Sequence, residues 1–408
     1  MTAACLERAK AAPLEITLYM PLSSSFADIF APYVQNTRTL VVHSTSTIKE
    51  LTNVFPNFPQ SMPTLRSLEL IKPQDTSREY PIDPFESFVP HLERLQLTGV
   101  PLYASLLGLG TLTEFTFSDR RFDLHLDILL NFLEQNHSLE RVTLDIYFAK
   151  LSLLELHRKT AIMNQLRYLS IDCSDKGDAR ALISSIPLQR GASLHIHLGG
   201  PDRTLSDFAP DVSAAHLSNP PSPTFFQLGH GPLTKYIALD GPGGKLSFHG
   251  HFWQEESFTD FAVLPLANVR KVHLLYRKKG TLKLPVFNPS YFPALETLTV
   301  DCNADVPNIL SDLLSNSPPS PSLKTIGFLN CDLSQDFMEE LTRFASECQN
   351  IPTSTWLHRV QIVHSDGVSP SAASICKLGE YVDLVEVLMG DKFSMDLMST
   401  ALTTPPCD

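Results

Sequence analysis

The sequence predicts an α/β solenoid, in which short parallel strands stack side by side and each strand is followed by a helical or irregular return segment. Three observations predict this fold class. A short apolar pattern recurs along most of the chain, its copies begin mostly 25 to 28 residues apart, and several intervening segments carry apolar residues at helical spacing. Intervals of this length leave room for the crossover connection that neighbouring parallel strands require.

The recurring pattern is an apolar residue, two variable residues, a second apolar residue, one variable residue and a third apolar residue. Its clear copies are Leu65/Leu68/Leu70, Leu92/Leu95/Leu97, Leu112/Phe115/Phe117, Leu139/Val142/Leu144, Leu166/Leu169/Ile171, Val269/Val272/Leu274, Leu295/Leu298/Val300, Leu323/Ile326/Phe328 and Leu357/Val360/Ile362. Weaker copies lie around residues 40–42, 194–198 and 382–387. A leucine-rich repeat of about 20–29 residues contains this pattern within the string L-x-x-L-x-L-x-x-N/C-x-L. The copy that begins at Leu323 matches the whole string, so the sequence predicts a leucine-rich-repeat solenoid.

The spacing within a copy has a physical reason. Side chains alternate between the two faces of a strand, so the second and third apolar residues point into the core while the residues beside them point outward. The return segments are visible at residues 125–136, where leucines recur at helical spacing, and after Ser334, which is expected to cap a helix. The residues that this second helix would bury are Phe337, Leu341, Phe344 and Cys348. A doubly wound α/β domain also alternates strands and helices, but it would have unequal strand sequences and glycine-rich turns.

The pattern divides the chain into three parts. We expect N-terminal repeats over 1–198, an irregular insertion within the solenoid over 199–268, and C-terminal repeats with a cap over 269–408. Within the insertion, residues 236–239 and 246–249 are expected to form a hairpin, because the segment between them is rich in glycine and contains a proline.

Composition and charge narrow the class of function. The chain has 408 residues, of which 43% are hydrophobic, and its formal net charge is −12. A negative surface repels the phosphates of nucleic acids and anionic membranes, so we expect a protein partner and neither of those. A secretory leader and an apolar run of about 20 residues are not apparent, and the cysteines are scattered, which indicates reduced thiols in the cytoplasm or nucleus. Three cysteines that follow repeat strands are expected to act as small buried hydrophobes: Cys173, Cys302 and Cys331.

Each motif that could bind phosphate or a metal also has a simpler structural interpretation. The segment Gly241–Lys245 lacks the first glycine of a phosphate-binding loop and the Ser or Thr that follows its lysine, so a hairpin turn is favoured. The pairs His195/His197 and His249/His251 would each project to one face of a strand, but no further ligand stands at zinc-site spacing. We therefore expect no catalytic residues, no metal and no cofactor, with a metal enzyme built on the histidine pairs as the weakest alternative.

Several segments resemble one protein family. Residues 6–16 read LERAKAAPLEI, and later copies read LERLQL (ending at Leu97), LRYLSIDC (ending at Cys173) and LETLTVDC (ending at Cys302). These segments resemble the leucine-rich region of fungal F-box-like proteins. The resemblance implies a leucine-rich-repeat fold and the substrate-recognition part of a ubiquitin-ligase receptor. The F-box itself, a helical module that docks onto a cullin ligase adaptor, has no match in this chain.

The outward positions of the strands are the expected binding surface. In a leucine-rich-repeat solenoid the strands line the concave side, and their outward side chains form a continuous polar sheet. The candidate partner-binding residues are Arg94, Gln96, Arg141, Thr143, Tyr168, Ser170 and Asp172. Arg and Tyr are enriched in interface hot spots, although any parallel sheet must also display solvated residues at such positions. The function expected is a non-catalytic, monomeric protein-binding module; the alternative is a stand-alone structural scaffold or a decayed paralogue without ligase association.

Overall fold

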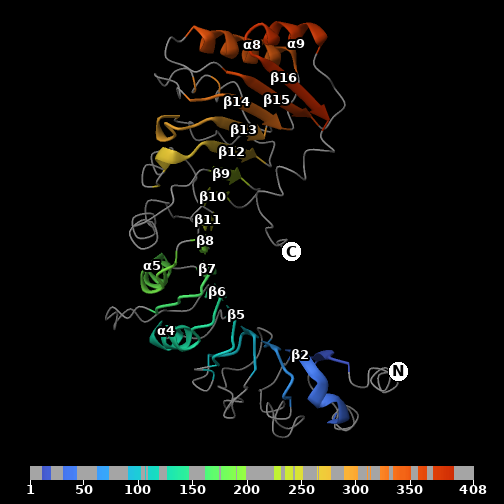
Figure 1. Ribbon diagram of the computed structural model, residues 1–408, viewed down its shortest axis with the longest axis vertical. Coiled ribbons are helices and arrows are strands. Elements are labelled where there is room, and N and C mark those ends of the chain that lie inside the picture. The colour runs from blue at the N-terminus through green and yellow to red at the C-terminus, as the bar shows by residue number, and fades with distance from the viewer. Residues whose placement is uncertain are drawn as a thin grey trace. The chain divides into compact units, whose positions relative to one another are not determined.

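The chain divides into two compact units, which are described separately. The N-terminal unit comprises Met1–Gly199 and Ala214–Asn219, and the C-terminal unit comprises Gly200–Ser213 and Pro220–Asp408. In the computed structural model (Figure 1) the described residues are 12–19, 31–43, 62–72, 91–102, 106, 109–118, 126–146, 161–173, 176–189, 191–198, 225–230, 235–241, 244–250, 264, 266–276, 289–301, 310, 313, 322–329, 334–350, 357–364 and 371–389. The assignment of residues 199–268 as an insertion stays a prediction.

The described residues of the N-terminal unit form eight parallel strands that neighbour one another in chain order. The strands are β1 (Leu14–Tyr19), β2 (Thr37–His43), β3 (Ser67–Ile71), β4 (Arg94–Thr98), β5 (Glu114–Ser118), β6 (Arg141–Asp145), β7 (Tyr168–Cys173) and β8 (Ser193–Leu198). A 3-10 turn, η1 (Ala31–Asn36), precedes β2, and two helices, α4 (Leu126–Gln135) and α5 (Lys176–Ser185), follow β5 and β7. Consecutive strands from β2 to β8 pair without any register shift.

The core of this unit is built from the repeated apolar positions. The second and third apolar residues of each copy are almost completely buried, as Leu95, Leu97 and Val142 show. The helices cover this inward side: the ring of Phe132 on α4 lies 4.4 Å from that of Phe115 on β5, centroid to centroid. Each fully buried aliphatic or aromatic side chain contributes about 1.5–3 kcal/mol. One rung cannot bury these residues alone, so stability depends on stacking.

The C-terminal unit begins with an antiparallel meander and continues as parallel rungs. The meander consists of β9 (Phe225–His230), β10 (Lys235–Gly241) and β11 (Gly244–Gly250). Strand β9 then pairs in parallel with β12 (Lys271–Tyr276), and the parallel order continues through β13 (Thr297–Asp301), β14 (Thr325–Leu329), β15 (Arg359–His364) and β16 (Leu384–Met389). Two short 3-10 turns, η6 (Leu266–Asn268) and η7 (Pro289–Tyr291), precede β12 and β13.

Two helices follow the later rungs of this unit, α8 (Gln335–Gln349) and α9 (Ala372–Gly379). The predicted cap of α8 is confirmed, because the N–H of Phe337 donates a hydrogen bond to Oγ of Ser334 at 3.3 Å. Ser371 caps α9 in the same way. The expected apolar face of α8 is also present: Phe337, Leu341 and Phe344 are buried, while Cys348 is partly exposed.

Both units have the architecture of a leucine-rich-repeat solenoid, so the predicted fold class is confirmed. Every clear copy of the apolar pattern ends in a strand. Within each unit the strands formed by these copies are neighbours in chain order, whereas the strand order of a doubly wound domain reverses part-way across the sheet. The predicted hairpin is present as β10 and β11. Strands β1 and β9 were not predicted, because neither segment contains the full apolar pattern.

Candidate functional site

The candidate site is the outward strand face, defined as the side chains of β3–β8 that point away from the core. Their registers place these side chains in three rows that run across the strands. The first row is Ser67, Arg94, Glu114, Arg141, Tyr168 and Ser193. The middle row is Glu69, Gln96, Thr116, Thr143, Ser170 and His195. The last row is Ile71, Thr98, Ser118, Asp145, Asp172 and His197.

In the first row, one arginine is held by a carboxylate and the other by an aromatic ring. Nε of Arg94 lies 3.2 Å from Oε2 of Glu114. The guanidinium carbon of Arg141 lies 4.8 Å from the centre of the Tyr168 ring, within the range of a cation–π contact. The Tyr168 ring in turn lies 4.8 Å from the imidazole of His195, tilted by 35°. Arg141, Tyr168 and His195 thus form a continuous cluster across β6, β7 and β8.

The side chains of the middle row are small beside this cluster. On β3 and β4, Nε2 of Gln96 donates a hydrogen bond to Oε1 of Glu69 at 2.8 Å. Further along, Thr116, Thr143 and Ser170 occupy the row, and all three are partly exposed. Among the residues that the structure describes, the hydroxyls of Thr143 and Ser170 make no hydrogen bond. These hydroxyls are therefore available to an incoming ligand.

The last row is acidic at β6 and β7. Oγ of Ser118 donates to Oδ2 of Asp145 at 2.7 Å, and Nδ1 of His197 lies 2.8 Å from Oδ2 of Asp172. The hydrogen bond to Asp172 raises the pKa of His197 above 6.5, against the opposing effect of burial, and the negative charges of Asp172 and Asp145 add to the increase. Protonated His197 would therefore partly neutralise this end of the face.

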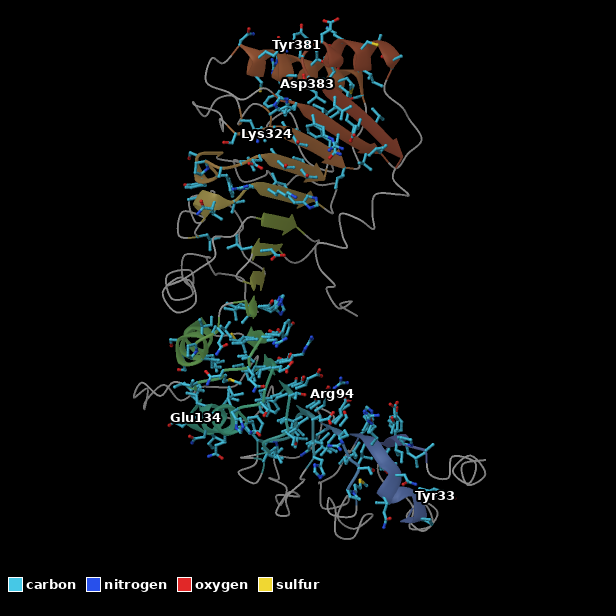
Figure 2. The ribbon with its side chains drawn as sticks, viewed as in Figure 1. Tyr33, Arg94, Glu134, Lys324, Tyr381 and Asp383 are labelled. Carbon is cyan, nitrogen blue, oxygen red and sulfur yellow. The ribbon has the colours of Figure 1, made fainter. Side chains whose placement is uncertain are left out.

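All seven candidate residues from the sequence lie on the outward strand face, but they do not form one cluster. Arg141, Thr143, Tyr168, Ser170 and Asp172 occupy the adjacent strands β6 and β7. Arg94 and Gln96 lie on β4, two strands from β6, and each is engaged by a neighbouring carboxylate. Figure 2 shows the labelled Arg94 among the strands and the labelled Glu134 on α4 at the helical side.

The sequence analysis did not include His195 and His197 in the candidate site. Both lie on the outward face of β8, where they contact Tyr168 and Asp172 respectively. The weaker copy at 194–198 contained the signal: Leu194 and Ile196 are buried, so the histidines between and after them had to point outward. Side-chain placements for the other pair, His249 and His251, lie outside the described residues.

On the outward face of the C-terminal unit, the polar side chains of β15 are engaged by Glu386 on β16. Nε and Nη2 of Arg359 contact Oε2 of Glu386 at 3.1 and 2.6 Å, and Nε2 of Gln361 donates to the same oxygen at 2.8 Å. Gly327 replaces a side chain in the middle of β14, and Val363 on β15 is 6% exposed. These contacts leave the arginine of this face engaged within the unit.

Two titratable side chains of the C-terminal unit have strongly shifted pKa values. Burial, with a smaller contribution from Glu347, raises the pKa of the Cys348 thiol to about 12. Burial also lowers the pKa of His273 on β12 to about 4, and its Nε2 is buried without a hydrogen-bond partner within the described part of the chain. Cys173 is buried as expected, whereas Cys302 and Cys331 lie outside the described residues. Groups of three or more His, Cys, Asp or Glu residues that could hold a metal ion do not occur in the described ranges.

Comparison with known proteins adds no family assignment, because neither the family models nor the curated proteins with which the chain was compared show a match. Among the described helices, none combines the length and the apolar character needed to cross a membrane. The longest of them, α8, has 15 residues.

Proposed function

We propose that this chain is a non-catalytic protein-binding repeat module, and that the outward strand face of its N-terminal unit is the ligand surface. The observation that carries the proposal is the Arg141–Tyr168–His195 cluster. Stacked arginine and tyrosine side chains are ordered before a partner arrives, so they lose little conformational entropy on binding. They are also residue types over-represented among hot spots.

The surroundings of the cluster support a protein rather than a nucleic acid as the ligand. Carboxylates lie in all three rows, at Glu114, Glu69 and Asp172, and the whole chain carries a formal charge of −12. A nucleic acid would bring a line of phosphates against these carboxylates. A polypeptide can instead present one charge where it is attracted and uncharged groups elsewhere.

The biological setting that we propose follows from the resemblance to F-box-like proteins. A module of this kind would recognise the substrate of a cullin-type ubiquitin ligase, as a monomer, in the cytoplasm or nucleus. The competing proposal is a stand-alone scaffold or decayed paralogue without ligase association. Purification of the protein tagged at its native locus separates the two: co-purification of a cullin adaptor supports the ligase role, and its absence from otherwise intact complexes supports the scaffold.

The proposed binding surface is tested by comparing the proteins recovered with the wild-type chain and with a variant carrying Arg94→Glu, Arg141→Glu and Tyr168→Glu. We expect the variant to lose specific partners while keeping the wild-type circular dichroism spectrum, because all three side chains point away from the core. A control variant carrying Arg343→Glu and Lys377→Glu changes exposed positions on α8 and α9. If the strand-face variant keeps every partner that the control keeps, the assigned surface is wrong.

A further inference from the structure

We propose, on the basis of the binding function above, that the strand face at β6 and β7 accepts a single carboxylate side chain, Asp or Glu, from a protein partner. Arg141 would supply the charge and the hydroxyls of Thr143 and Ser170 would supply further hydrogen bonds. The three residues are brought together by the register, because Arg141 pairs with Tyr168 and Thr143 pairs with Ser170.

Arg141 differs from the other arginine of the first row in how it is held. Arg94 is in an ion pair with Glu114, whereas Arg141 lies over the Tyr168 ring at 4.8 Å. In the ion pairs seen between described residues, Arg141 has no carboxylate partner. A guanidinium stacked on a ring keeps its N–H groups free at its edge, and this planar fork matches the two oxygens of a carboxylate.

The small side chains beside Arg141 leave room for the ligand and provide donors. Thr143 and Ser170 are partly exposed neighbours in the middle row, and both hydroxyls lack a hydrogen bond among the described residues. A serine or threonine hydroxyl can donate one hydrogen bond to a carboxylate oxygen. The ring of Tyr168, flanked by His195, adds an apolar surface for the carbon chain of the incoming residue.

The charges around this position favour a carboxylate over a phosphate. The register places Glu114 on β5 next to Arg141, and Asp145 and Asp172 lie two residues beyond Thr143 and Ser170 on β6 and β7. Two residues of a strand span about 6.6 Å, which is less than the Debye length of about 8 Å at physiological salt. Asp172 and Glu114 therefore repel any anion placed here. A carboxylate has a single negative charge, which the one unengaged arginine matches, whereas a phosphate would bring a second negative charge that no described cation here matches.

The experiment uses a display library of short random peptides, selected on the full-length chain. The enriched sequences are made as synthetic peptides, and their affinities are measured against the wild-type chain and against Arg141→Gln. We expect enrichment of peptides that contain Asp or Glu. Replacing that residue by Gln or Asn in the peptide, or Arg141 by Gln in the protein, should each weaken binding about tenfold to a hundredfold. The two changes together should weaken binding little more than either alone, because both remove one contact.

Two further variants separate the mechanism from a general loss of charge or of fold. Arg141→Lys keeps the charge and removes the planar fork, so we expect it to restore only part of the affinity lost in Arg141→Gln. Arg343→Gln on α8 removes an exposed arginine elsewhere and should leave peptide affinity unchanged. A phosphoserine version of each peptide, with phosphoserine in place of Asp or Glu, should bind more weakly than the carboxylate peptide.

The outcomes distinguish this proposal from the proposed function. Basic or uncharged peptides that lose affinity with Tyr168→Ala but not with Arg141→Gln would leave the binding face in place and overturn the carboxylate assignment. Tighter binding of the phosphoserine peptides would overturn it as well. Peptides insensitive to both Tyr168→Ala and Ser170→Arg would overturn the binding face itself, and a library without any enriched peptide would overturn the carboxylate anchor.

Discussion

The two units contain the same kind of core but differ in the face that their strands turn outward. In the N-terminal unit that face carries charged residues, small hydroxyls and the Arg141–Tyr168–His195 cluster. The corresponding face of the C-terminal unit also carries a charged residue and hydroxyls, as at Lys271, Thr297 and Thr299. Its arginine, however, is paired with Glu386, Gly327 has no side chain and Val363 is nearly buried. A repeat constrains its inward residues because each rung must pack on the next. Its outward residues are free to vary, so differences between units are where binding specificity is expected.

The largest expected effect tests whether the two cores are equivalent. Phe115 on β5 and Phe328 on β14 are both completely buried, and each contacts a phenylalanine of a covering helix, Phe132 or Phe337. We expect Phe115→Ala and Phe328→Ala each to lower the free energy of unfolding by about 3–5 kcal/mol, measured by urea denaturation. If only one substitution is strongly destabilising, the two cores are not built alike.

Histidine titration should affect the two units in opposite directions. The folded-state pKa of His273 is about 4, below the ordinary 6.5. The folded chain therefore keeps this histidine neutral, and at most about 3 kcal/mol of stability is lost as the pH falls from 6.5 toward 4, because the unfolded chain binds the proton first. The pKa of His197 is raised by Asp172. The stability that protonated His197 contributes is fully present below pH 6.5, and it is lost as the pH rises through the raised pKa of the folded state.

The measurement for this pair is the free energy of unfolding of wild type, His197→Gln and His273→Gln across the acidic and neutral range. We expect His273→Gln to reduce the loss of stability on the acid side, and His197→Gln to reduce the loss above 6.5. Two variants with identical pH profiles would contradict the assignment of opposite roles.

A smaller effect is expected where the backbone of neighbouring rungs comes close. Gly99, just after β4, has φ of +65°, and a Cβ built there would lie 2.8 Å from the carbonyl oxygen of Lys72. Gly99→Ala should therefore destabilise the N-terminal unit by about 1–3 kcal/mol, measured by denaturation. Gly110 is the matched control, because a Cβ there meets no atom within 4 Å. Equal effects of Gly99→Ala and Gly110→Ala would show that the close approach is unimportant.

The smallest expected effect concerns the ion pairs on the two outward faces. Arg359 and Glu386 have side chains 42% and 26% exposed, whereas Arg94 and Glu114 are 65% and 40% exposed. Solvent screens both pairs, so Arg359→Gln should cost at most about 1 kcal/mol and Arg94→Gln less. Glu386 also accepts a hydrogen bond from Gln361. This bond, and then the hydrogen bond from Arg359, lower the pKa of Glu386. A larger loss for Arg94→Gln than for Arg359→Gln would reverse this order.

The strands were predictable because their apolar spacing is fixed by the core. The copy at Leu139, Val142 and Leu144, for example, forms β6, and the serine before α8 caps that helix as expected. Strand β1 was not predicted because it is an edge strand, in which Leu14 and Ile16 are only partly buried and the full pattern is not required. In β9 the register with β12 places Phe226 and Leu228 at the second and third apolar positions, and the first position is Pro223 in the sequence, so the full pattern is not present.

The outward positions of the candidate site were also predictable, but the contacts between them were not. Alternation along a strand shows that Arg94 and Arg141 point outward. It does not show which residue stands beside them, because that depends on the register between rungs. Intervals of 20 and 27 residues between first positions give the same register, so Arg94 meets Glu114 and Arg141 meets Tyr168. The availability of Arg141 follows only from that arrangement.

The central claim is that the N-terminal strand face, and not its C-terminal counterpart, binds the partner. The most direct test places a photo-crosslinking amino acid at Thr143 in one protein and at Gln361 in another, because each is the central outward residue of its strand, β6 or β15. After irradiation in cells, the account predicts a specific crosslinked protein from position 143 that is lost with Arg141→Glu, and none from position 361. The same crosslinked protein from position 361 alone would contradict it.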